Sequence, residues 1–292
     1  MNALERMDLA IRLARGAGAI LRASYGKAHE VGYKGRINLV TEADKASESW
    51  LTAELAKAVP GELLLAEEEG TRILGEMAVT ANPIARKGAA IDWSALAGRD
   101  VWLVDPLDGT TNYAHHLPVF AVSIGYVQQG VPVCGVIYDP MRDELFSAAK
   151  GHGARLDGAQ IHVSECPDLG KALLVSGFPY DIADPALASA ARPSPVELFV
   201  GFLGRAQSVR RLGSAALDLA YVAAGRFDGH FEVGLSPWDT AAGWCLVTEA
   251  GGTVSGFAGE PFSPFEPRVL ASNGALHGSL LEALRDMGAS GT

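Results

Sequence analysis

The feature that most constrains this chain is an apolar segment that runs directly into two carboxylates. Residues 101–104 read VWLV, a composition typical of a buried β-strand. Asp105 and Asp108 follow on either side of a Pro-Leu pair, and Gly109 comes next. A buried strand that ends in two carboxylates must have their charge neutralised, and a bound cation does this. The sequence therefore predicts a cation site at the end of a core strand.

Acidic residues also stand at the ends of three other predicted segments. Asp44 lies near the start of a helix that begins at Thr41, residues 67–69 are three glutamates after a short strand, and Asp239 opens another helix. Each has an ordinary explanation as a helix cap, a turn residue or a solvated charge. Taken together, oxygen ligands without histidine or cysteine favour Mg²⁺ or Mn²⁺ over zinc. Clustered cations would also offset the repulsion between an anionic phosphate and a chain of net charge -10.

The residues after Gly109 are suited to holding a phosphate. Thr110 and Thr111 begin a helix or loop, and a threonine here can cap that segment or hold a water and pass on its proton. The free N–H groups at a helix start face a phosphate oxygen well. Gly213 and Ser214 offer a second helix start of the same kind.

Helical and strand patterns are mixed along the 292 residues, without an internal repeat or an obvious linker. This predicts a layered α+β or α/β architecture in which helices cover the sheet faces. Residues 71–99 have weak periodicity and are interpreted as an insertion or mobile loop with a possible hairpin inside. Helices are expected over 4–24, from Thr41, from 213–214 and over 238–252, and a loop over 181–196.

Composition excludes several classes of function. The net charge of -10 argues against a nucleic-acid or anionic-membrane surface. Three scattered cysteines without a CxxC pair favour reduced thiols in the cytoplasm over zinc ligands or disulfides. Neither a signal peptide nor an apolar run of about 18 residues is found, so a membrane protein is not expected.

Four motifs occur in the order that is known from one family. The segment DPLDGTTN (105–112) resembles the signature of the inositol monophosphatase family, and WDTAAGWCLVTEAGG (238–252) resembles its second signature. KGRINLVTEAD (34–44) is similar to its N-terminal motif. LLAEEEG (64–70) is similar to its G-E-E segment, with Ala66 in place of the glycine.

The resemblance implies a five-layer αβαβα sandwich that forms a homodimer. It also implies a magnesium-dependent, lithium-sensitive phosphatase with two or three metal ions, Mn²⁺ being the alternative ion. We expect a single phosphatase fold over residues 1–292, with subdomains at about 1–150 and 151–285.

The resemblance also assigns roles to individual residues. Asp44 is expected to partner Thr110, and this pair, together with Glu68, forms the catalytic group that orients the attacking water. The implied metal ligands are Glu68, Asp105, the carbonyl of Leu107, Asp108 and Asp239, with Lys34 and Glu67 near a third metal. The implied substrate contacts are Asp108, Gly109, Thr110, Thr111, Gly213, Ser214, Glu232 and Asp239.

The expected reaction is hydrolysis of a small polyol or sugar phosphate, with inositol monophosphate as the first candidate because Thr111 and Asn112 follow D-G-T. Fructose 1,6-bisphosphate, histidinol phosphate and 3′-phosphoadenosine 5′-phosphate are the alternative substrates. A regulatory binding protein that kept the fold and lost catalysis is the alternative from another class.

Overall fold

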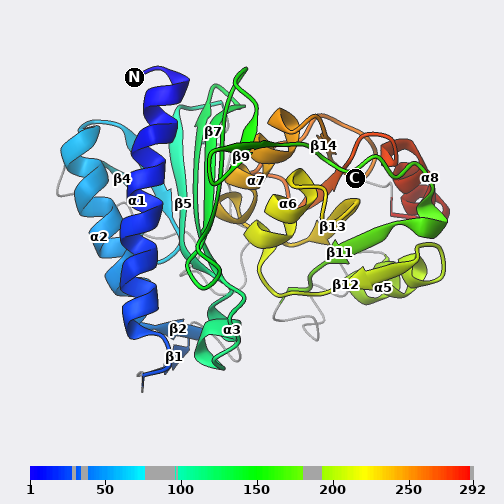
Figure 1. The fold of residues 1–292 in the computed structure, drawn as a ribbon, viewed down its shortest axis with the longest axis horizontal. Coiled ribbons are helices and arrows are strands. Elements are labelled where there is room, and N and C mark those ends of the chain that lie inside the picture. Colours follow the sequence, from blue (N-terminus) through cyan, green and yellow to red (C-terminus); the bar gives the residue numbers. More distant parts are fainter. Residues whose placement is uncertain (28–30, 34–38, 76–95, 97, 180–192, 290–292) are drawn as a thin grey trace.

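The computed structural model describes residues 1–27, 31–33, 39–75, 96, 98–179 and 193–289. Its elements form five layers, in which helix pairs alternate with two β-sheets (Figure 1). This confirms the layered α/β architecture and the αβαβα order. Within these residues, no helix is both long and apolar enough to span a membrane.

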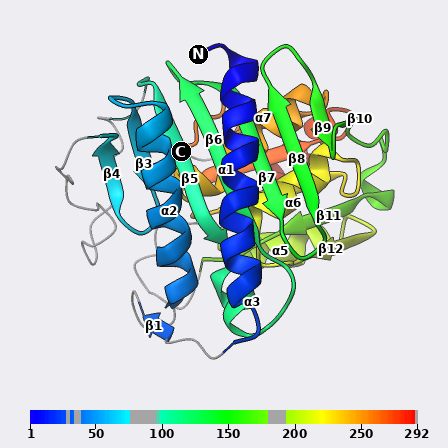
Figure 2. The same cartoon turned by 60° about the vertical axis from the view of Figure 1, so that its left-hand side comes forward.

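The first layer consists of α1 (Ala3–Ser24) and α2 (Glu42–Ala58), which lie across one face of the larger sheet (Figure 2). Both helices were predicted from their apolar periodicity. Each begins with a capping box, in which the N-cap side chain and the side chain three residues later exchange hydrogen bonds with the backbone. For α2 these residues are Thr41 and Asp44, so the cap fixes the position of Asp44.

The larger sheet has the strand order β10-β9-β8-β7-β6-β5-β3-β4, and among its described strands only β3 and β5 pair in parallel. In that parallel pair Ala66 lies opposite Val104. The residues that follow them, Glu67 and Asp105, therefore lie side by side at the same edge of the sheet. The strands are β3 (Leu63–Ala66), β4 (Gly70–Ile73), β5 (Val101–Asp108), β6 (Ala121–Gln128), β7 (Val131–Asp139), β8 (Glu144–Ala149), β9 (Ala154–Leu156) and β10 (Ala159–Ile161).

Strand β5 continues beyond Val104, where the sequence predicted a break. Asp105 pairs with Ser123 of β6 and Asp108 with Ala121, so β5 has one more residue than its partner over this stretch. Pro106 has no N–H to donate to the ladder, which accounts for a bulge at this point.

Helices α6 (Ala215–Ala223) and α7 (Pro237–Glu249) form the central layer between the two sheets. Glycines let α7 approach the larger sheet closely. A methyl group on Gly135 would lie 2.4 Å from the carbonyl oxygen of Ala242, and one on Gly125 would lie 2.8 Å from the Cβ of Ala241. This contact fixes the start of α7 beside the end of β5.

The smaller sheet has the order β12-β11-β13-β15-β14, and α5 (Pro195–Leu203) and α8 (His277–Asp286) cover its outer face. Its strands are β11 (Leu173–Ser176), β12 (Ser208–Arg210), β13 (Gly229–Val233), β14 (Thr253–Ser255) and β15 (Arg268–Ser272). Strands β1 (Val31–Tyr33) and β2 (Leu39–Thr41) form a separate pair, and α3 (Thr110–Ala114) follows β5.

Two predicted loops fall largely outside the described residues. Of the predicted insertion 71–99, residues 71–73 complete β4, which pairs with β3 as a hairpin. Positions 76–95 and 97 are outside the described part of the chain, as is most of the predicted loop 181–196, from which α5 begins at Pro195.

Candidate active site

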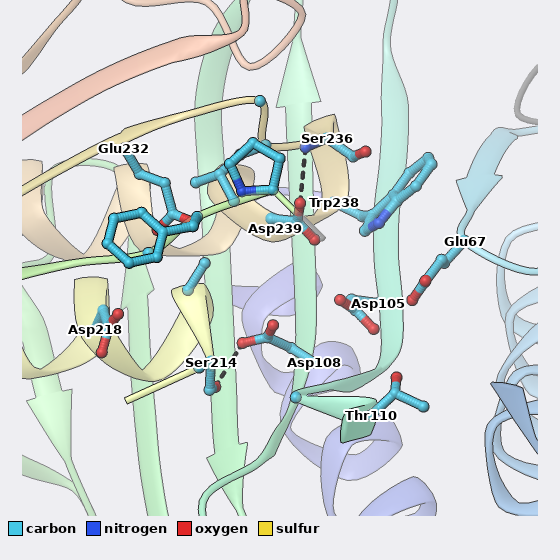
Figure 3. Close-up of a pocket in the computed structure, with 18 of the residues that line it drawn as sticks. Glu67, Asp105, Asp108, Thr110, Ser214, Asp218, Glu232, Ser236, Trp238 and Asp239 are labelled. Atoms are coloured by element: carbon cyan, nitrogen blue, oxygen red, sulfur yellow. Dashed lines mark hydrogen bonds between the residues drawn. The ribbon is translucent and has the colours of Figure 1, made fainter. Parts of the chain in front are cut away.

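A pocket of about 280 Å³ lies where the ends of β3 and β5 meet the starts of α3, α6 and α7 (Figure 3). Its lining is rich in acidic side chains, which come from segments far apart in the sequence. These acids are Glu67, Asp105, Asp108, Asp218, Glu232 and Asp239.

Three of the acids form a compact group. Asp105 and Asp108 on β5 and Asp239 on α7 each present a carboxylate oxygen, and the three oxygens lie within 4.8 Å of one another. Burial raises the pKa of all three, to about 6 for Asp108, and repulsion between the neighbouring carboxylates adds to the effect. A bound cation would therefore stabilise the ionised form of these three carboxyl groups.

Backbone and hydroxyl groups hold each of these carboxylates in a fixed orientation. The Leu107 N–H donates to Oδ1 of Asp105 at 2.9 Å, and the Ser236 N–H donates to Oδ2 of Asp239 at 2.7 Å. Oδ2 of Asp108 accepts hydrogen bonds from the Ser214 hydroxyl at 2.5 Å and the Ala216 N–H at 2.8 Å. Such supporting contacts are typical of ligands that surround a metal ion.

The donor set fits a hard divalent cation. Buried carboxylate oxygens clustered without nitrogen or sulfur are the ligands that Mg²⁺ and Mn²⁺ prefer.

The start of α7 adds a detail that the sequence did not predict. The N-cap residue of α7 is Ser236, not Asp239. Asp239 lies three residues later, and its carboxylate accepts a hydrogen bond from the Ser236 N–H, which completes a capping box.

Glu67, rather than Glu68, lines the pocket. The Glu67 carboxylate is close enough to raise the pKa of Asp105. The backbone N–H groups of Glu68 and Glu69 instead donate to Glu48 at 2.7 and 2.6 Å, which holds the turn after β3. The parallel register of β3 and β5 thus brings Glu67, rather than the expected Glu68, into the pocket beside Asp105.

Thr110 lines the pocket and Asp44 lies behind it. The Thr110 hydroxyl is 3.1 Å from Oδ1 of Asp44 and 3.1 Å from the Leu107 carbonyl oxygen. The other Asp44 oxygen accepts the Thr41 N–H at 2.8 Å and also the Thr41 hydroxyl. Asp44 therefore serves both as a helix cap and as the partner of Thr110.

The predicted phosphate-binding turn forms as a tight junction. Gly109 has φ +95°, and a side chain there would lie 2.9 Å from the Val119 carbonyl oxygen, so only glycine fits. Gly109, Gly213 and Ser214 line the pocket, whereas Thr111 is not among its lining residues. The Asn112 amide donates to the carbonyls of Val119 and Leu212 at 2.8 and 2.9 Å.

Glu232 lines the opposite end of the pocket from Glu67 (Figure 3). Burial raises its pKa to about 8, with repulsion from Asp239 and Asp108 adding to this. Gly177 makes room for this side chain, because a methyl group on Gly177 would lie 2.2 Å from Oε1 of Glu232.

Two further residues at this end were missed or misplaced by sequence reasoning. Asp218 on α6 lines the pocket, and burial raises its pKa well above the usual range. An aspartate within the apolar run AALDLAYVA is a signal that could have found it. Arg211 also lines the pocket, and no expectation from the sequence placed a basic side chain there. Lys34, expected near a third metal, lies outside the described residues.

Comparison with known proteins places the chain in a family. The inositol monophosphatase family model matches residues 3–289. The chain is 40% identical to an inositol-1-monophosphatase of Synechocystis sp. over 95% of its own length and 88% of the relative. It is 38% identical to the Nus factor SuhB of Escherichia coli over 96% of both chains.

Solved structures agree with this. An inositol monophosphatase from Anabaena (Nostoc) sp. superposes with a TM-score of 0.80 at 40% identity, covering 98% of this chain and 97% of the other. An IMPase from Thermotoga maritima gives a TM-score of 0.78 at 31% identity, covering 97% and 98%. The chain belongs to the inositol monophosphatase family.

Proposed function

We propose that this protein is a magnesium-dependent phosphatase that hydrolyses the phosphate monoester of a small polyol, with inositol monophosphate as its first candidate substrate. The observation that carries the proposal is the convergence of Asp105, Asp108 and Asp239 on one pocket that also contains Thr110. The name of the relative from Synechocystis supports the same substrate.

The acidic end of the pocket is suited to bind the phosphate group through metal ions. We assign the ligand positions to Glu67, Asp105, the Leu107 carbonyl, Asp108 and Asp239. Ions held there would supply the positive charge that attracts the phosphate and stabilises the leaving oxygen. Two or three Mg²⁺ ions would fit the family, with Mn²⁺ as the alternative.

The remaining groups of the chain position the reactants. The Thr110 hydroxyl donates a hydrogen bond to Asp44. Its oxygen then has a lone pair free to accept a hydrogen bond from the attacking water in the pocket. The Asp44 carboxylate can take up the proton that is released. The backbone N–H groups that follow Gly109 are placed to bind phosphate oxygens.

The opposite end of the pocket favours an alcohol over a second phosphate. Asp218 and Glu232 are buried carboxyl groups there, and they can exchange hydrogen bonds with hydroxyl groups but offer a second phosphate no compensating positive charge. This argues for a polyol and against fructose 1,6-bisphosphate and the adenosine bisphosphate. Arg211 is the one basic side chain among the described residues that line this pocket.

A regulatory binding protein is the second candidate, because relatives at 37–38% identity carry the name Nus factor SuhB. The complete acidic group in the pocket supports catalysis in this chain. A homodimer, a cytoplasmic location and lithium inhibition stay predictions from the family resemblance.

The deciding experiment is a phosphate-release assay over inositol monophosphate, fructose 1,6-bisphosphate, histidinol phosphate and 3′-phosphoadenosine 5′-phosphate, with and without Mg²⁺. We expect Mg²⁺-dependent release that is fastest with inositol monophosphate, and loss of release in Asp105→Asn. Folded protein that releases no phosphate from any substrate at saturating Mg²⁺ would favour the regulatory alternative.

A further inference from the structure

A second group of ionisable side chains lies at the end of the pocket that is away from the three aspartates. It consists of Asp218 on α6 and His230 and Glu232 on β13, whose ligand atoms lie within 4.8 Å of one another. Alternate residues of a strand share a face, so His230 and Glu232 project to the same side of β13, where α6 packs. Nε2 of His230 is 3.7 Å from Oε2 of Glu232.

These side chains are buried and their polar atoms lack partners. Asp218 is 1% exposed, His230 0% and Glu232 7%. Among the described residues, Oδ1 of Asp218, both ring nitrogens of His230 and Oε2 of Glu232 have no hydrogen-bond partner. They make up four of the six such buried side-chain atoms found in the described part of the chain. A buried polar atom that nothing satisfies destabilises the folded state, so the concentration of these atoms in one place indicates a ligand.

We propose that Asp218, His230 and Glu232 bind a divalent transition-metal ion, with Zn²⁺ as the best fit. Two carboxylates balance the ion's charge, and the imidazole selects zinc over magnesium. Ligand atoms on one zinc ion are about 3–3.5 Å apart, so small side-chain rotations close the site. This goes beyond the proposed phosphatase function and does not depend on it.

The position of the site gives it a consequence for the pocket. Asp218 and Glu232 line the pocket, so an ion bound by them would have an entry path from the space where the substrate's alcohol portion would lie. Zinc at this site competes with substrate hydroxyl groups for Glu232. Arg211 opposes zinc, because its positive charge acts on both Asp218 and Glu232.

The test begins with protein freed of metal by a chelator and measures Zn²⁺ binding by equilibrium dialysis, without any turnover assay. Wild type is expected to bind one more zinc ion per chain than His230→Phe, and Arg211→Gln to bind this ion more tightly. His162→Phe, the same substitution at an exposed histidine, is the matched control and keeps the wild-type stoichiometry. A zinc-soaked crystal should show an anomalous peak between the three side chains.

Equal zinc stoichiometry in wild type and His230→Phe, with an anomalous peak only at the three aspartates, overturns the proposal. Thermal unfolding of the metal-free proteins shows whether a loss of zinc binding in the variant could come from misfolding. His230→Phe removes two unpartnered buried nitrogens and should unfold at the wild-type temperature or above. Because phosphate release is measured separately, an inactive protein that still binds this zinc refutes only the phosphatase proposal.

Discussion

The hydroxyl oxygen of Thr110 lies 3.1 Å from Oδ1 of Asp44, although 66 positions separate the two residues in the sequence. The Asp44 carboxylate is held in place by the capping box at the start of α2, so the geometry of one helix end fixes the partner of a pocket hydroxyl.

Thr110→Ala is expected to lower kcat for phosphate release by about 10²–10⁴-fold, the usual contribution of a group that takes part in proton transfer. Thr110→Ser keeps the hydroxyl and should recover most of the activity. The readout is kcat and KM at saturating Mg²⁺, with KM expected to change little. Equal activity in the alanine and wild-type proteins would show that this hydroxyl has no part in the reaction.

Asp44→Ala should affect both activity and stability. It removes the partner of Thr110 and also the side chain that closes the cap with Thr41, and loss of such a cap costs about 1 kcal/mol. Chemical denaturation should show this loss in addition to the fall in kcat. Asn2→Ala, at the equivalent cap of α1, is the control, with a similar loss of stability and unchanged kcat.

Asp105→Asn is expected to abolish Mg²⁺-dependent turnover and to stabilise the metal-free protein. Burial and repulsion from Glu67 and Asp108 raise the pKa of Asp105, so the amide removes an unfavourable charge. Thermal unfolding should show a higher Tm than wild type without metal, and a smaller rise on adding Mg²⁺. An unchanged Mg²⁺-induced rise in Tm would argue against this carboxylate as a ligand.

The stability of the metal-free protein should fall as pH rises from about 4 to 8. Burial raises the pKa of Asp108 to about 6 and that of Glu232 to about 8, so the folded state holds protons that the unfolded state has already lost. Each such group can contribute a slope of about 1.4 kcal/mol per pH unit. Glu232→Gln should flatten the dependence between pH 6 and 8, as measured by denaturant unfolding, while a slope equal to that of wild type would exclude Glu232 as its source.

Gly177→Ala should raise KM more than it lowers kcat. A methyl group at this position would lie 2.2 Å from Oε1 of Glu232 and must displace that side chain from the pocket. Gly170→Ala, in the exposed turn before β11, serves as the control and should leave KM unchanged. Steady-state kinetics with inositol monophosphate separates the two effects.

Local patterns were sufficient to predict much of the acidic group. The capping signal at Thr41 predicted the start of α2 and so the position of Asp44. The apolar run before Asp105 and Asp108 predicted that both acids lie at the end of a buried strand. These signals span only a few residues, so they can be read without knowledge of long-range contacts.

The features that sequence reasoning missed depend on long-range packing. The choice between Glu67 and Glu68 is set by the register of β3 against β5, which no local pattern specifies. Asp218 and His230 meet only because α6 packs on β13. Helix α5 was not predicted, because PVELFVGFL is apolar at most positions and is only nine residues long.

The bulge at Pro106 has a geometric consequence for the acid pair. Residues three apart in a regular strand point to opposite faces, yet Asp105 and Asp108 pair with Ser123 and Ala121, which lie two apart and share a face. The additional residue thus turns an odd spacing into an even one. Anyone who transplants this pair of carboxylates into another sheet would have to carry the irregularity along with them.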